Sequence, residues 1–170
     1  MTPVQYTTVL FDWGDTVMKD DPASSVPMVE WETVEPVQGI ESVLEYLQTS
    51  GRRMMLATSA SISDEAQIRG ALGRAGLDSY FSRIFCFKNT GLPKGEAFYR
   101  HILDALAISA AEAVMVGDSF EKDVLEANGV GIAAVWFNPR SEKIQKNISH
   151  SCVYTMEELL SYFQSLDHRK

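Results

Sequence analysis

The chain has 170 residues, 45% of them hydrophobic, and its formal net charge is −8. This length and apolar fraction suit one folded domain and argue against a mainly disordered chain. The acidic balance argues against nucleic acid as the main partner, because binding a phosphate backbone requires clusters of lysine and arginine. No run approaches the roughly 18 apolar residues needed to cross a bilayer, so we expect no membrane association.

The cysteines and the N-terminus favour a cytoplasmic location. Cys86 and Cys152 lie far apart and lack C-x-x-C or zinc-ligand spacing, which favours a reducing compartment. The first five residues lack the basic segment of a secretory signal, so we expect none.

Apolar strands and amphipathic helices alternate along the chain. Runs rich in β-branched and aromatic residues predict strands at residues 6–11, 53–57, 83–87, 113–116 and 131–136. Apolar stripes predict helices at residues 39–51, from Ser61 or Ser63 to about 76, at 95–106, at 120–128 and at 155–166. Ser109 and Glu112 have the spacing of a capping box for one further turn. Because the strands are apolar on both faces, we expect a doubly wound, Rossmann-like α/β domain with a parallel sheet.

Residues 17–38 interrupt this alternation directly after the first strand. Three prolines break any helix or strand period there, and a loop this long in a compact domain is more often functional. We therefore interpret 17–38 as a flap or loop insertion. Its five acidic residues and one lysine give it a charge of −4, so a loop that overhangs a site should disfavour polyanionic ligands and tolerate an amine-bearing one.

Polar residues follow several of the predicted strands. In a doubly wound sheet, ligands bind beyond the carboxyl ends of the strands, near the point where strand order reverses. Asp12 follows the first strand, Thr58-Ser59 the second and Asp118 the fourth, with Asp123 five residues later, while Lys94 precedes the third helix. Each residue alone could be a helix cap, a turn former or a solvated charge. Their ordered placement indicates one common site.

Four segments resemble the motifs of the haloacid dehalogenase superfamily, most of whose members are magnesium-dependent phosphohydrolases. Phe11–Thr16 resembles the first motif, Thr58 the second, Lys94 the third and Val116–Asp123 the fourth, which is the most specific. The resemblance extends from Val9 to about residue 137. The ordered set is far more specific than any one of these patterns.

The resemblance implies a carboxylate nucleophile and a metal ion. Asp12 would form an aspartyl-phosphate, which splits one difficult displacement into two easier ones. Mg²⁺ would be held by Asp12, the backbone carbonyl of Gly14 and Asp118, with Asp123 as a direct ligand or just behind it.

The resemblance also implies residues that bind the phosphoryl group. Lys94 would neutralise the nucleophile and the transferring phosphoryl group. The Thr58 hydroxyl and the Ser59 amide, at a helix start, would hold a phosphate oxygen. Gly95 follows Lys94 where the family commonly has proline, which leaves Lys88 as an alternative for the lysine role.

The first motif departs from the family pattern at Gly14. Phosphatases of the family have a second aspartate two residues after the nucleophile, which protonates the leaving oxygen and then activates water. Here that position is Gly14, and an aspartate follows one place later as Asp15. Acid–base catalysis is typically worth about 10²–10⁴ in rate. Either Asp15 takes the role, or it stabilises the turn and the rate is low unless the leaving group is good.

The chain has no room for the helical cap domain of many relatives, so we expect a single domain without a separate cap. An open site suits a phosphoester on a small molecule or a protein, and leaves homo-oligomer formation open.

A magnesium-dependent phosphomonoesterase is the leading hypothesis. The alternatives are a catalytically degenerate phosphate- or metal-binding regulatory module and a carbon–halogen or phosphonate hydrolase. Trp13 and Trp31 could stack on a substrate, although packing is their expected role.

Overall fold

A single parallel sheet organises the computed structural model, which describes residues 4–142 and 150–168. Its strand order is β3-β2-β1-β4-β5-β6, which confirms the doubly wound α/β prediction. The strands are β1 (Thr8–Phe11), β2 (Arg53–Ala57), β3 (Phe81–Phe85), β4 (Ala113–Gly117), β5 (Ala133–Phe137) and β6 (His150–Val153). The sixth strand was not predicted.

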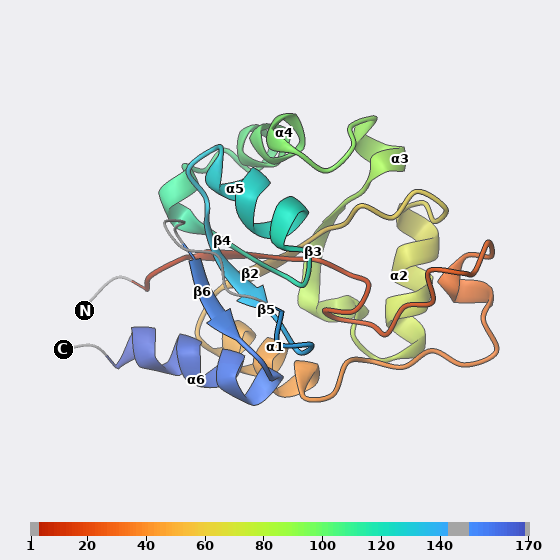
Figure 1. Ribbon diagram of the computed structural model, residues 1–170, viewed down its shortest axis with the longest axis horizontal. Helices are drawn as coiled ribbons and strands as arrows, with labels where there is room; N and C mark the ends of the chain where they lie inside the picture. Colours follow the sequence, from red (N-terminus) through yellow and green to blue (C-terminus); the bar gives the residue numbers. More distant parts are fainter. Residues whose placement is uncertain (1–3, 143–149, 169–170) are drawn as a thin grey trace.

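Helices cover both faces of the sheet (Figure 1). One face packs against α1 (Ile40–Thr49), α2 (Glu65–Arg74) and α6 (Met156–Asp167). The other packs against α4 (Glu96–Leu106) and α5 (Glu126–Asn128). Shorter segments are α3 (Phe87–Thr90), a π-helical turn at Phe120–Leu125, and 3₁₀ turns at Met28–Glu30, Asp78–Tyr80 and Ala110–Glu112. In the described part of the chain, none of the helices combines the length and the apolar character that crossing a bilayer requires.

The predicted start of α2 was wrong. Neither Ser61 nor Ser63 caps this helix; Asp64 does, because its side chain accepts from the Gln67 amide while the Gln67 side chain accepts from the Asp64 amide. An aspartate is at least as good a cap as serine, and the reciprocal bonds satisfy two otherwise unpaired amides.

Two further boundaries differ from the predicted ones. Strand β3 begins and ends two residues earlier than expected, because Cys86 starts α3. The segment predicted as one helix at 120–128 opens as a π-helical turn and becomes α-helical only at Glu126. The predicted capping box of Ser109 and Glu112 is confirmed.

The register of the central strands fixes where their polar ends lie. Phe11 at the end of β1 pairs with Leu56 of β2 on one side and Val116 of β4 on the other. The Asp12 amide continues this pairing by donating to the Val116 carbonyl at 2.9 Å. Strand order reverses between β1 and β4, so the residues that follow these two strands meet at the crevice where such sheets bind ligands.

The 17–38 loop is tied to the domain at its base and near its middle. At the base, the Val37 amide donates to the Val17 carbonyl at 2.9 Å. Near the middle, the guanidinium of Arg74 at the end of α2 donates to the carbonyls of Val29 and Trp31 at 3.0 and 2.6 Å. These contacts hold the loop beside α2, as Figure 1 shows.

Candidate active site

A buried cluster of charged groups lies at the carboxyl end of the sheet. Lys94, just before α4, places its ammonium 3.0 Å from Asp12 Oδ1 and 2.5 Å from Asp123 Oδ1. The side chains of Lys94 and Asp123 are each 1% exposed and that of Asp12 is 11% exposed. The alternative lysine, Lys88, is exposed on α3. The structure therefore brings Lys94, and not Lys88, against the predicted nucleophile.

Burial and mutual repulsion shift the pKa values of this cluster. Burial raises the pKa of Asp12 to about 6, against the lowering effect of Lys94. Burial, with the neighbouring Asp12 carboxylate, raises the pKa of Asp123 to about 6 as well, and burial also raises the pKa of Asp118. Burial alone would lower the pKa of Lys94, but the flanking carboxylates of Asp12 and Asp123 raise it instead. The single positive charge of Lys94 therefore cannot balance the negative charges of both Asp12 and Asp123.

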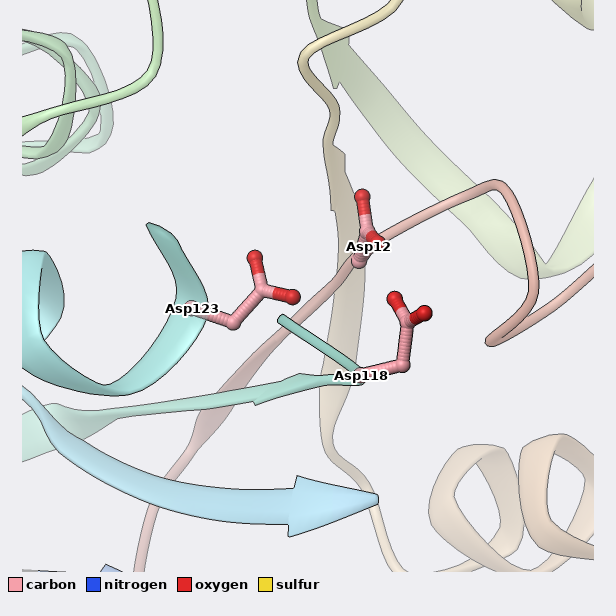
Figure 2. A group of neighbouring side chains, drawn as sticks. All are labelled: Asp12, Asp118 and Asp123. Atoms are coloured by element: carbon pink, nitrogen blue, oxygen red, sulfur yellow. The ribbon is translucent and has the colours of Figure 1, made fainter. Parts of the chain in front are cut away.

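The three aspartates form a set of oxygen donors that fits a divalent cation. One carboxylate oxygen from each of Asp12, Asp118 and Asp123 lies within 4.8 Å of the others. Figure 2 shows the three carboxyl groups gathered around a common space. Magnesium prefers oxygen ligands and usually takes one or two protein carboxylates together with waters, so two of these carboxylates with the third behind them would fit it.

The protein holds both carboxylate oxygens of Asp123 at shorter distances than those of Asp118, whose Oδ1 accepts from the Thr16 hydroxyl at 3.4 Å and whose Oδ2 lies 3.8 Å from the Arg140 guanidinium. Asp123 Oδ1 pairs with Lys94, and Asp123 Oδ2 accepts from the Ser119 amide at 2.9 Å. A Cβ at Gly117 would overlap the Asp123 carboxyl, so the carboxyl fits only because residue 117 is glycine. This arrangement favours Asp123 as a residue that lies just behind the metal ligands and does not bind the ion directly.

A cavity of about 350 Å³ opens onto Asp12 and Asp118. Its walls come from the segments after β1, β2 and β4, which include Thr58 and Ser59 as well as Ser119 and Lys122. The 17–38 loop supplies much of one wall, with Asp20 and Asp21 among polar residues and Met28 and Trp31 among apolar ones. Acidic, hydroxyl-bearing and apolar residues therefore all line the cavity. Sequence reasoning did not place Lys122 at this site.

The predicted phosphate-binding pair is only partly arranged as expected. Thr58 is buried and lines the cavity, but its Oγ1 accepts from the Ala60 amide at 3.0 Å. Ser59 also lines the cavity. The expectation that its amide stands at a helix start was wrong, because α2 begins only at Glu65. Five residues of loop separate Ser59 from that helix, so the helix dipole does not act at Ser59.

Asp15 is held in a turn. Its backbone is left-handed, with φ of 58°, and its amide donates to the Met18 carbonyl at 2.6 Å. Its Oδ1 accepts from the Asp20 amide at 3.0 Å. These contacts favour the turn-stabilising alternative for Asp15.

Asp20 lies against the position where the family pattern expects an aspartate. A Cβ built on Gly14 would come within 2.9 Å of Asp20 Oδ2 and 3.2 Å of Asp20 Cβ. Burial raises the pKa of Asp20, and the carboxylates of Asp15 and Asp21 add to the rise. The sequence shows Asp20 only as one of several acids in a loop, so this placement depends on the loop conformation.

A sequence model of the haloacid dehalogenase-like hydrolases matches residues 23–137, which is more than half of the chain. The chain belongs to this family. The matched range begins after Asp12, so the placement of Asp12 beside Lys94 and Asp118 comes from the geometry described above.

Curated relatives of this chain carry phosphatase names. It is 33% identical over 112 residues to the ribulose-1,5-bisphosphate 5-phosphatase of Halopiger xanaduensis, covering 65% of this chain and 46% of that protein. It is 31% identical over 100 residues to the pyrimidine 5'-nucleotidase PynA of Streptococcus pneumoniae, covering 58% of this chain and 40% of that protein. The matches thus span less than half the length of these relatives.

A solved structure extends the likeness in fold over nearly the whole chain. The crystal structure of an uncharacterized protein from Listeria monocytogenes serotype 4b matches with a TM-score of 0.82 at 23% identity. The match covers 95% of this chain and 99% of that chain. A similar fold is therefore found in a chain of similar extent.

Proposed function

We propose that this protein is a magnesium-dependent phosphomonoesterase that works through an aspartyl-phosphate on Asp12. The observation that carries the proposal is the ion pair of Asp12 with the buried Lys94, at a cavity that Asp118 also lines. Phosphatase names among the curated relatives support the same reaction class. The cavity is large enough for a small phosphoester, although its volume alone does not select one.

In the first step, a carboxylate oxygen of Asp12 attacks phosphorus and the bond from phosphorus to the ester oxygen breaks. The leaving oxygen takes a proton and departs as an alcohol. In the second step, water attacks the phosphoryl group, the bond between Asp12 and phosphorus breaks, and inorganic phosphate leaves with the carboxylate regenerated.

The chain's own residues lower the charge barrier to these steps. The Lys94 ammonium faces Asp12 and balances negative charge as the phosphoryl group approaches. Thr58 and Ser59, which line the cavity after β2, would offer a hydroxyl and an amide to the phosphate oxygens. Asp118, with Asp12 and the Gly14 carbonyl, would hold Mg²⁺, which when bound offsets the charge of the carboxylates and the phosphate.

Turnover of p-nitrophenyl phosphate tests this proposal. We expect phosphate release with Mg²⁺ and none with EDTA, and we expect Asp12→Asn to lose at least about 10³-fold of the rate. Asp104→Asn is the matched control, because Asp104 is an exposed aspartate on α4. Intact-protein mass spectrometry of acid-quenched enzyme should find a phosphoryl group on the wild type and none on Asp12→Asn. Full activity of Asp12→Asn would overturn the proposal.

Calorimetry separates this function from that of a regulatory binding module. The lack of a side chain at Gly14 is the observation that favours such a module. A module would bind phosphate or a phosphoester in the presence of Mg²⁺, while releasing no phosphate from any substrate tested.

A further inference from the structure

Gly14 has no backbone reason to be glycine. It is not among the residues with a positive φ, so an ordinary side chain suits its backbone. What a side chain would meet is Asp20, whose Oδ2 would lie 2.9 Å from a Cβ on Gly14, so one of the two would have to shift. A carboxyl group from six residues further along the chain therefore already occupies the space that a residue-14 side chain would enter, two residues after Asp12.

The proposed reaction needs a group that donates and then accepts a proton. The leaving oxygen must be protonated in the first step, and the attacking water must lose a proton in the second. Asp12 and Asp123 pair with Lys94, and Asp118 belongs to the set of metal donors. Those three carboxyls are therefore committed to charge balance, which leaves the carboxyls of the 17–38 loop and Asp15 for proton transfer.

Asp20 is held for this task by its neighbours. Its amide donates to Asp15 Oδ1 at 3.0 Å, and its own Oδ1 accepts from the Asp21 amide at 2.9 Å. Within the described ranges, its Oδ2 accepts no hydrogen bond, and Asp20 lines the same cavity as Asp12. Asp15, in contrast, uses its carboxyl to fix the Asp20 backbone, in a turn whose left-handed φ of 58° directs the chain back toward Gly14.

We infer that Asp20 is the acid–base residue of the site and that Asp15 is its positioning residue. This inference rests on the proposed function. The protonated Asp20 carboxyl gives its proton to the ester oxygen as the bond from phosphorus to oxygen breaks, which leaves Asp20 as a carboxylate. That carboxylate then takes a proton from the water that attacks the Asp12 phosphoryl group, so Asp20 is protonated again when phosphate leaves.

Two substrates separate the acid role of Asp20 from a merely structural one. p-Nitrophenol is a much stronger acid than phenol, so p-nitrophenyl phosphate needs little protonation of its leaving oxygen and phenyl phosphate needs more. For Asp20→Asn we expect kcat/KM on phenyl phosphate to fall by about 10²-fold or more, and kcat/KM on p-nitrophenyl phosphate to fall much less. Asp15→Asn keeps an oxygen that accepts from the Asp20 amide and should change both values little, whereas Asp15→Ala removes this acceptor and should lower kcat/KM on phenyl phosphate by a smaller factor than Asp20→Asn does.

The base role has its own readout. If Asp20→Asn cannot activate water, the phosphoenzyme should accumulate, and acid-quenched mass spectrometry should find a larger phosphorylated fraction than in the wild type. Glu32→Gln is the matched control, because it removes the same charge from an exposed residue of the same loop that lies outside the cavity lining. It should leave the ratio of the two kcat/KM values and the phosphorylated fraction as in the wild type.

A relocation of the carboxyl gives the sharpest test. Gly14→Asp alone should not raise activity, because the new side chain meets Asp20. The double variant Gly14→Asp with Asp20→Ala removes the obstacle. Its kcat/KM on phenyl phosphate should be at least about tenfold higher than that of Asp20→Ala alone.

The outcomes distinguish this inference from the function on which it rests. An active wild type, an inert Asp12→Asn and an Asp20→Asn with both kcat/KM values unchanged would overturn the role of Asp20 and leave the phosphatase intact. The same pattern with Asp15→Asn showing the selective loss on phenyl phosphate would assign the acid to Asp15 instead. An Asp12→Asn variant as active as the wild type would overturn the phosphatase itself.

Discussion

The ammonium of Lys94 lies 3.0 Å from the Asp12 carboxylate, although 82 positions separate the two residues in the chain. Both side chains are almost fully buried. Breaking a buried ion pair by removing one partner typically costs about 3–5 kcal/mol, because the other charge stays buried and uncompensated. In this cluster the remaining charges would be the carboxylates of Asp12 and Asp123.

We therefore expect Lys94→Met to lower the free energy of unfolding by about 3 kcal/mol near neutral pH. Turnover should fall by about 10²-fold or more, since a positive charge at the reacting phosphoryl group is lost. Lys88→Met on α3 is the control, and as an exposed substitution it should change stability by less than about 0.5 kcal/mol. Urea denaturation and phosphate release measure the two effects. A stable, active Lys94→Met would contradict the role given to this ion pair.

The raised pKa values of Asp12 and Asp123 predict how stability depends on pH. Both are about 6, above the ordinary value of 3.8. The contribution of these two carboxyls to folding is therefore full below about pH 4 and is lost as the pH rises through about 6. Lys94 stays charged over this range, because its own pKa is raised, so it adds nothing to the change.

Magnesium should reverse that loss, because it binds the ionised carboxylates. In urea denaturation we expect Mg²⁺ to raise the free energy of unfolding clearly at about pH 7.5 and little at about pH 5. Asp12→Asn removes one carboxylate while Lys94 stays paired with Asp123, so this variant should be more stable than the wild type in EDTA at the higher pH and should respond less to Mg²⁺. An equal response of the wild type at both pH values would contradict the cation site.

Gly117→Ala tests the fit of Asp123 under the site. A Cβ at this position overlaps the Asp123 carboxyl, so the carboxyl must move away from Lys94 and the Ser119 amide. We expect a loss of about 1–3 kcal/mol in stability and weaker Mg²⁺ binding by calorimetry. Gly73→Ala is the control, because a Cβ on that α2 glycine meets nothing within 4 Å and should stabilise the helix by about 0.5–1 kcal/mol. Unchanged Mg²⁺ affinity in Gly117→Ala would show that Asp123 need not stay in place.

The sheet and the residues at its strand ends could be predicted, because both follow from local patterns. Asp12 and Asp118 each follow a short apolar run, and parallel strands that neighbour one another bring such residues together. Strand β6 escaped prediction because His150–Val153 is short and only its last residue is fully buried. Its pairing with β5, and not its own composition, makes it a strand.

The acid–base candidate could not be found from sequence, because it depends on how a loop folds back. Asp15 is adjacent to Gly14 in the chain, which made it the natural substitute. The left-handed turn at Asp15 instead returns the chain so that Asp20 lies beside Gly14. Only three-dimensional placement separates these two aspartates. The sequence also could not show which acidic residues of the 17–38 loop face the site. Asp20 and Asp21 line the cavity, whereas Glu35 pairs with Lys19 at the surface.

Asp21 should determine how the site treats substrates with a second phosphate. It lines the cavity but takes no part in the proposed chemistry, and its carboxylate repels a distal anion. We expect Asp21→Asn to raise kcat/KM several-fold for a sugar bisphosphate at low salt, while phenyl phosphate changes little. The gain should shrink as ionic strength rises, because salt screens the repulsion. Glu32→Gln removes the same charge from a residue outside the cavity lining and should leave both substrates unaffected. A gain of similar size in Glu32→Gln would mean that the net charge of the loop, and not the position of Asp21, governs selectivity.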